Sequence, residues 1–159
     1  MEDEPANKRV KSESQLDQLS SFSIVVSDTG DVDAISIFHP QDATTNPSLI
    51  FKAAQLPQYQ HLVTHAIEYG ILKSNNIVTP ETMEIIIDKL SVNFGAEITK
   101  IVPGYVSTEV DARLSFDTAG TITRARRIIS MYAELGIDKS RILIKVILLI
   151  LLSNYIILL

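Results

Sequence analysis

Short extended runs recur along this chain, and a helical pattern follows each of the first three. They lie near residues 23–27, 41–45, 105–110 and 141–146. Because strands that alternate with helices usually form parallel sheets, this order predicts a parallel α/β architecture. In a (β/α) barrel the reactive groups gather at the carboxyl ends of the strands. The ends of the four runs are therefore where a function would be located.

Polar residues stand at the ends of the first three runs. Asp28 follows the first run, and Thr44 and Asn46 close the second, just ahead of a proline that begins a helix. The third run alternates, so that Ser107 and Glu109 share one face of the strand. Taken singly, Asp28 is typical of a turn and Asn46 of a helix cap. Both interpretations stay open until the residues are considered together.

Lys145 lies in the fourth run, among branched apolar residues that predict a buried strand. Burial of an amine favours its uncharged form, and an uncharged amine can attack a carbonyl to form a Schiff base. The alternative is a lysine at the end of a strand that reaches water along its own aliphatic stem.

The four segments together resemble those of transaldolases, in the same order and with matching spacing. The resemblance extends from about Gln15 to Val146. It is carried by Val25-Val26-Ser27-Asp28-Thr29-Gly30-Asp31, Gln41-Asp42-Ala43-Thr44-Thr45-Asn46-Pro47-Ser48, Val106-Ser107-Thr108-Glu109-Val110-Asp111-Ala112-Arg113 and Arg141-Ile142-Leu143-Ile144-Lys145.

The resemblance implies a transferase of the pentose phosphate pathway. Such an enzyme moves a dihydroxyacetone unit from sedoheptulose 7-phosphate to glyceraldehyde 3-phosphate, giving fructose 6-phosphate and erythrose 4-phosphate. It uses a lysine Schiff base and needs no metal or organic cofactor.

The resemblance also implies a role for each matching residue. Lys145 is the nucleophile that forms the Schiff base, Asp28 is the base for the substrate hydroxyl, and Glu109 activates a water molecule. Asn46 hydrogen-bonds the hydroxyls of the dihydroxyacetone unit. Thr44 and Ser107 lie on the same motifs and support these groups.

The chain has 159 residues, whereas a complete (β/α) barrel typically has about 250. We therefore expect a barrel of the transaldolase and class I aldolase type that stops after about four of its eight strands. The arginines that hold the substrate phosphate in the family have no counterpart here. We expect this chain to be inactive by itself. The alternative is a non-catalytic fragment that binds full-length subunits or associates with membranes through its C-terminal tail.

Composition excludes several other functions. The net charge is −5, with acidic and basic residues interspersed, so a nucleic-acid surface is not expected. The chain has no cysteine, which excludes disulfides and thiolate metal sites and agrees with a cytoplasmic location. The resemblance implies sugar phosphates as partners, and a homo-oligomer is left open.

Both ends of the chain differ from the domain between them, residues 15–146. Residues 1–14 are polar and charged and predict a disordered tail, in which residues 8–11 are a weak candidate for nuclear import. Residues 147–159 are hydrophobic and unlike the family. As a helix, the apolar segment from Val146 would extend about 21 Å, short of a bilayer core of about 30 Å. A membrane anchor is therefore not the favoured interpretation.

Several helix boundaries follow from capping signals. Ser14, Thr79 and Asp117 are candidate N-caps, and Gly136 is a candidate stop. We expect helices over residues 33–38, 47–69 with an interruption at Pro57, and from Pro80 to Ile101. Three arginines, Arg124, Arg126 and Arg127, are expected on the solvated face of a helix. His61 and His65 have the spacing of a zinc-binding helix but lack its glutamate and a third ligand, so we interpret them as surface residues.

Overall fold

The computed structural model describes residues 14–146 of this chain. The predictions for the two tails therefore lie outside the described residues, except at Ser14. The strands are β1 (Val26–Asp28), β2 (Asp42–Thr44), β3 (Val106–Glu109) and β4 (Ile142–Lys145). The α-helices are α1 (Gln15–Phe22), α2 (Val32–Phe38), α3 (Pro47–Ala54), α4 (Gln60–Lys73), α5 (Pro80–Thr99) and α6 (Thr118–Glu134). Short 3₁₀ helices cover Pro57–Tyr59, Ala112–Leu114 and Lys139–Arg141.

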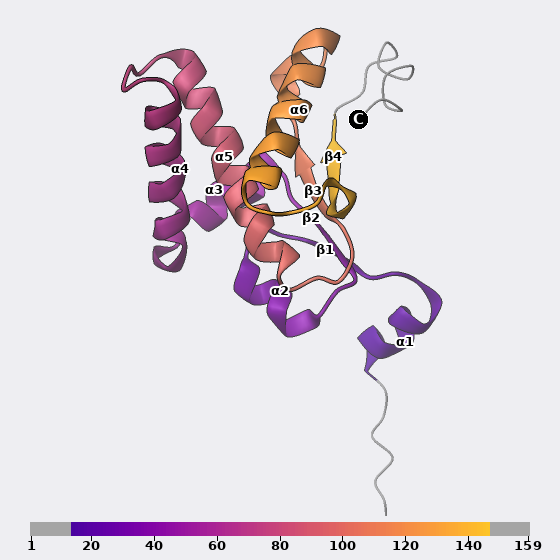
Figure 1. Ribbon diagram of the computed structural model, residues 1–159. Coiled ribbons are helices and arrows are strands. Elements are labelled where there is room, and N and C mark those ends of the chain that lie inside the picture. The colour runs from indigo at the N-terminus through magenta and orange to yellow at the C-terminus, as the bar shows by residue number, and fades with distance from the viewer. Residues whose placement is uncertain (1–13, 147–159) are drawn as a thin grey trace, which may run out of the picture.

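The four strands form one parallel sheet in the order β1-β2-β3-β4. Each strand therefore pairs with the next one along the chain, as neighbouring strands of a (β/α) barrel do. Helices α5 and α6 lie beside the sheet, and α4 lies outside α5 (Figure 1). The predicted parallel α/β architecture with four strands is confirmed for the described residues.

The strands are shorter than the runs that predicted them. The first run was expected to form a strand near residues 23–27, but β1 begins only at Val26, the residue that pairs with Asp42. Ile24, just before β1, is 68% exposed. A position with no neighbouring strand opposite it has no ladder hydrogen bonds, so the apolar run is longer than the strand.

Capping side chains set the helix starts, as the sequence predicted. Ser14 and Thr79 each form a capping box, with Asp17 and Thr82 respectively. The Asp117 side chain accepts a hydrogen bond from the backbone of Gly120, three residues on. The segment before α5 is also as expected, with its helix broken at the 3₁₀ turn after Leu56. Helix α4 then runs four residues beyond the predicted end, and α5 ends two residues earlier than predicted.

The core lies between the sheet and helices α5 and α6. It is formed by apolar side chains of the strands and helices: Ala43, Val92, Ile98, Val106, Ala125, Ile128, Met131, Tyr132 and Ile142. A second cluster joins α3 and α4 to Phe94 on α5, where the ring of Tyr59 packs edge-on at 5.3 Å between centroids. These contacts fix α5 between the sheet and the α3–α4 segment.

The expectation that the three arginines of α6 lie on a solvated face is wrong for Arg124. Its side chain is buried and donates from Nε to Asp88 on α5 at 2.8 Å. Arg127 donates to the other oxygen of the same carboxylate at 2.8 and 2.6 Å. Arg126 is exposed, as expected. Asp88 lies on another helix, so local sequence gave no sign of this pairing.

Candidate active site

The sheet register places the candidate residues in two rows on one face. Asp28 pairs with Thr44, and Thr44 pairs with Ser107, which forms one row across three strands. Glu109 pairs with Lys145 two residues further along β3 and β4. Residues opposite each other in neighbouring strands point to the same side of a sheet, and residues two apart share a face. The register therefore places five of the six predicted site residues on one face of the sheet.

The other face of the sheet is the one that packs on the helices. Ala43, Val106, Thr108 and Ile142 point that way, and all four are buried. The face with the candidate residues is more open, since Val26 and Leu143, which share it, are each 50% exposed. The candidate residues thus lie at the carboxyl ends of the strands, on the side that forms the interior of a barrel.

Glu109 and Lys145 form the closest contact among the candidate residues. Lys145 Nζ lies 3.1 Å from Glu109 Oε2, and the carboxylate side chain is only 9% exposed. The backbone holds the pair in register, because Val110 N donates to Lys145 O at 2.9 Å. An amine and a carboxylate at this distance can exchange a proton directly or through one water molecule.

The expected burial of Lys145 is not found. Its side chain is 42% exposed, because β4 is the edge strand of the described sheet and its inner face has no strands opposite. The amine is therefore reached by solvent as well as by Glu109. Of the two sequence-based interpretations, the lysine that reaches water describes this environment better.

Asp28 is exposed, and its carboxylate has no hydrogen-bond partner within the described residues. The turn that follows it is held by side chains that the sequence did not single out. Gly30 packs so closely on α3 that a Cβ there would lie 2.7 Å from Leu49 O. Tyr59 donates to Asp31 Oδ1 at 2.8 Å, and burial raises the pKa of Tyr59 to about 12. These contacts fix the loop after β1 and leave the Asp28 carboxylate available.

Asn46 follows β2 with an extended backbone and caps α3. Its Oδ1 accepts from Leu49 N at 3.0 Å, so the helix-cap interpretation of this residue is correct. Its Nδ2 has no partner among the described residues and remains able to donate to a ligand. Just before it, Thr45 is buried and donates from Oγ1 to Ser107 O at 3.0 Å, which ties the end of β2 to β3. The sequence marks Thr45 only as a hydroxyl within the Thr44-Thr45-Asn46 run. It does not show that this hydroxyl points into the protein.

Metal ligands do not gather in this region or elsewhere in the described part of the chain, where no three His, Asp or Glu side chains are close enough to hold an ion. His61 and His65 are both exposed. Within residues 14–146 no helix is long and apolar enough to cross a membrane.

Strands in sequential parallel order, helices on one face and polar residues at the carboxyl ends define a protein of the (β/α)-barrel type. Residues 25–148 match the family model described as Transaldolase/Fructose-6-phosphate aldolase. The chain belongs to this family, which confirms the resemblance seen in its sequence.

Curated relatives named transaldolase match the same region. The chain is 58% identical to a transaldolase of Shewanella loihica over 130 residues, which is 82% of this chain and 40% of the relative. It is 60% identical to that of Rattus norvegicus over 138 residues, covering 87% and 40% of the two chains. It is 55% identical to transaldolase A of Escherichia coli over 131 residues, covering 82% and 41%. The chain thus spans about two fifths of the length of these relatives.

Proposed function

We propose that the open face of the sheet is the Schiff-base portion of a transaldolase site. The observation that carries this proposal is the pairing of Glu109 with Lys145 at 3.1 Å, in register at the carboxyl ends of β3 and β4. Family membership supports it, because the relatives are named for this activity. The substrates would be sedoheptulose 7-phosphate and glyceraldehyde 3-phosphate.

In the proposed reaction the Lys145 amine attacks the ketose carbonyl, and loss of water gives an iminium ion. Glu109, 3.1 Å from the amine, gives a proton to the hydroxyl that leaves as water. It later takes a proton from the water that hydrolyses the iminium. Asp28 takes the proton of the substrate hydroxyl while the adjacent carbon–carbon bond breaks, and the bonding electrons move into the iminium. The aldose product leaves, and the enamine attacks the aldehyde of the acceptor, whose oxygen takes the proton back from Asp28. Hydrolysis of the new iminium then restores Lys145.

The binding residues fit this division of roles. Asn46 Nδ2 is an amide donor without a partner in the described chain, and the Thr44 and Ser107 hydroxyls lie in the same row as Asp28. Asp28 and Lys145 are separated by three strand spacings, about 14 Å along the sheet before curvature is considered. Curvature of the sheet into a barrel brings these side chains closer, so we propose that turnover requires closure of the sheet and that the chain alone does not turn over.

A chimeric enzyme tests the proposal. Residues 25–146 would replace the matching segment of transaldolase A of Escherichia coli, to which this region is similar. We expect fructose 6-phosphate formation in a coupled assay, its loss in Lys145→Arg, and its retention in Arg126→Gln, an exposed control. A folded chimera that is inactive, or one in which Lys145→Arg keeps its activity, would refute the proposal.

A second candidate function is binding to another polypeptide of the same family through the open face. The observation that favours it is the half-exposed pair Val26 and Leu143 on that face, with β1 and β4 unpaired at the edges of the described sheet. Unpaired strand edges bind further strands. Size-exclusion chromatography with an intact transaldolase tests it: co-elution that Leu143→Glu weakens supports binding, and separate elution excludes it.

A further inference from the structure

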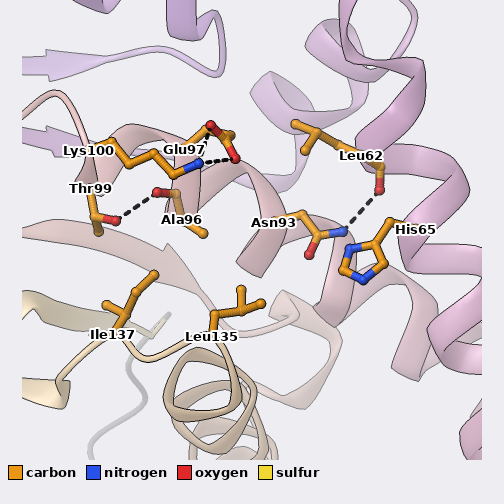
Figure 2. A pocket seen from close by; sticks show the side chains of 9 residues that line it. All are labelled: Leu62, His65, Asn93, Ala96, Glu97, Thr99, Lys100, Leu135 and Ile137. Atoms are coloured by element: carbon orange, nitrogen blue, oxygen red, sulfur yellow. Dashed lines mark hydrogen bonds and ion pairs between the residues drawn. The ribbon is translucent and has the colours of Figure 1, made fainter.

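A cavity of about 270 Å³ lies outside the sheet, between α4, α5 and the segment that follows α6. Figure 2 shows the side chains that line it: Leu62, His65, Asn93, Ala96, Glu97, Thr99, Lys100, Leu135 and Ile137. Glu97, Thr99 and Lys100 lie at the C-terminal end of α5, which leads to β3. Leu135 and Ile137 lie between α6 and β4. The cavity is thus near the amino ends of the strands, at the opposite end of the sheet from Glu109 and Lys145.

Asn93 gives this cavity one specific polar group. The residue is only 4% exposed, and its Nδ2 donates to Leu62 O at 3.0 Å, which fixes the orientation of the amide. Its Oδ1 has no hydrogen-bond partner, and it is the single buried side-chain atom of the described residues in that state. In Figure 2 this oxygen points away from the Leu62 carbonyl, towards the side on which Leu135 lies. A buried acceptor without a partner is destabilising, because it has lost the hydrogen bond to water that it makes in the unfolded chain. A ligand that donates to it replaces that hydrogen bond.

Of the other polar side chains around the cavity, His65 is exposed, and the remaining three bond within α5 and its C-cap. Lys100 Nζ lies 2.7 Å from Glu97 Oε1, and Thr99 Oγ1 donates to Ala96 O at 2.7 Å. The cavity therefore offers no unpaired charge from this pair, and a charged ligand would have to be desolvated without compensation. The walls from Leu62, Ala96, Leu135 and Ile137 are apolar and favour an apolar body.

We propose that this cavity binds a small uncharged molecule with an apolar ring and a single hydroxyl donor, a phenol in chemical class. The hydroxyl donates to Asn93 Oδ1, and the ring packs on Leu62, Leu135 and Ile137. The volume of the cavity is sufficient for such a ring, because a cavity of about 150 Å³ holds benzene and this one is larger. The proposal does not depend on the proposed function, because none of the predicted site residues lines the cavity.

The test uses the full chain with two probes that differ only in the donor, 4-methylphenol and its methyl ether. Isothermal titration measures both affinities, and the methyl resonances of Leu62 and Leu135 report where each probe binds. We expect 4-methylphenol to bind about tenfold more tightly, as for one hydrogen bond to a buried acceptor. Equal affinities or no saturable binding would overturn the proposal and would leave water as the partner of Asn93 Oδ1. Binding that leaves the methyl resonances of both leucines unshifted would also overturn it.

Variants separate the hydrogen bond from the apolar contact. Asn93→Leu removes the acceptor and is expected to abolish the difference between the two probes. Leu135→Trp fills the cavity from a partly exposed position, so it is expected to abolish binding of both probes even if Asn93→Leu does not fold. Ile67→Trp, at an exposed position of α4 outside the lining, is the matched control and should leave both affinities unchanged. Unchanged binding in Leu135→Trp contradicts the assigned site.

Discussion

The hydroxyl groups of Thr108 and Tyr132 lie 2.6 Å apart in the interior and join β3 to α6. Both side chains are fully buried, and burial raises the pKa of Tyr132 well above its ordinary value. Thr108 sits between Ser107 and Glu109 and points to the opposite face. This hydrogen bond therefore holds the strand that carries Glu109 against the helix behind it.

Gly95→Ala is expected to destabilise the fold by about 1–3 kcal/mol, the usual cost of overpacking. A Cβ at Gly95 would overlap Tyr132 Oη, the atom that bonds Thr108. Urea denaturation checks the effect. In the double variant with Tyr132→Phe, which lacks this oxygen, the cost of adding the Cβ should be smaller than in the single variant. Additive costs would contradict the contact as described.

Asp88→Asn is expected to destabilise by about 3–5 kcal/mol, because it removes the closest and most buried of the carboxylates that neutralise the Arg124 guanidinium. Burial raises the pKa of Asp88, while Arg124 and Arg127 act in the opposite direction and favour the carboxylate. Glu84→Gln is the matched control. Its carboxylate contacts the same two arginines from a side chain that is 43% exposed, so its removal should cost less than about 1 kcal/mol. Similar losses in both variants would refute this distinction.

Tyr59 makes stability depend on pH in the alkaline range. Its pKa is about 12 in the folded chain, because of burial, and about 10 when unfolded. The folded state holds this proton more tightly, so the contribution is present below pH 10 and is lost as the pH rises towards 12. The decline in unfolding free energy over this window should be smaller in Tyr59→Phe than in the parent chain. An equal decline would show that Tyr59 is not its source.

At neutral pH, Tyr59→Phe should itself cost about 1–2 kcal/mol, since it removes the donor to Asp31 Oδ1. The same substitution loosens the loop after β1. In the active chimera we therefore expect a lower kcat, since this loop positions Asp28. Thermal unfolding and steady-state rates measure the two effects, and Tyr105→Phe, at a half-exposed position, is the control.

Borohydride trapping of the chain alone should give little or no adduct at Lys145 with fructose 6-phosphate. The amine is exposed and close to Glu109, but the open sheet offers no closed cavity to orient the ketose. Peptide mass mapping locates any adduct. Extensive labelling confined to Lys145, and absent in Lys145→Arg, would show that the open face suffices for imine formation.

The strand–helix order and the shared face of the site could be predicted from sequence, because both depend on local periodicity. Alternation alone placed Ser107 and Glu109 together, and the capping residues placed the starts of α5 and α6. Long-range pairing could not be predicted in this way. Arg124 is buried because Asp88, 36 positions earlier, lies opposite it. Lys145 is exposed because β4 is an edge strand in the described sheet, and the composition of its own strand cannot report that.

The sequential strand order has a consequence for how the sheet assembles. Within the described residues each strand after β1 pairs with the strand that precedes it in the chain, so each new strand finds its partner already synthesised. Arg141 strengthens the last of these steps, since it donates to the carbonyl groups of Gly104 and Val102 at the start of the β3 unit. The sheet can therefore grow in the direction of translation, one β-strand at a time, with each completed strand serving as the template for the next.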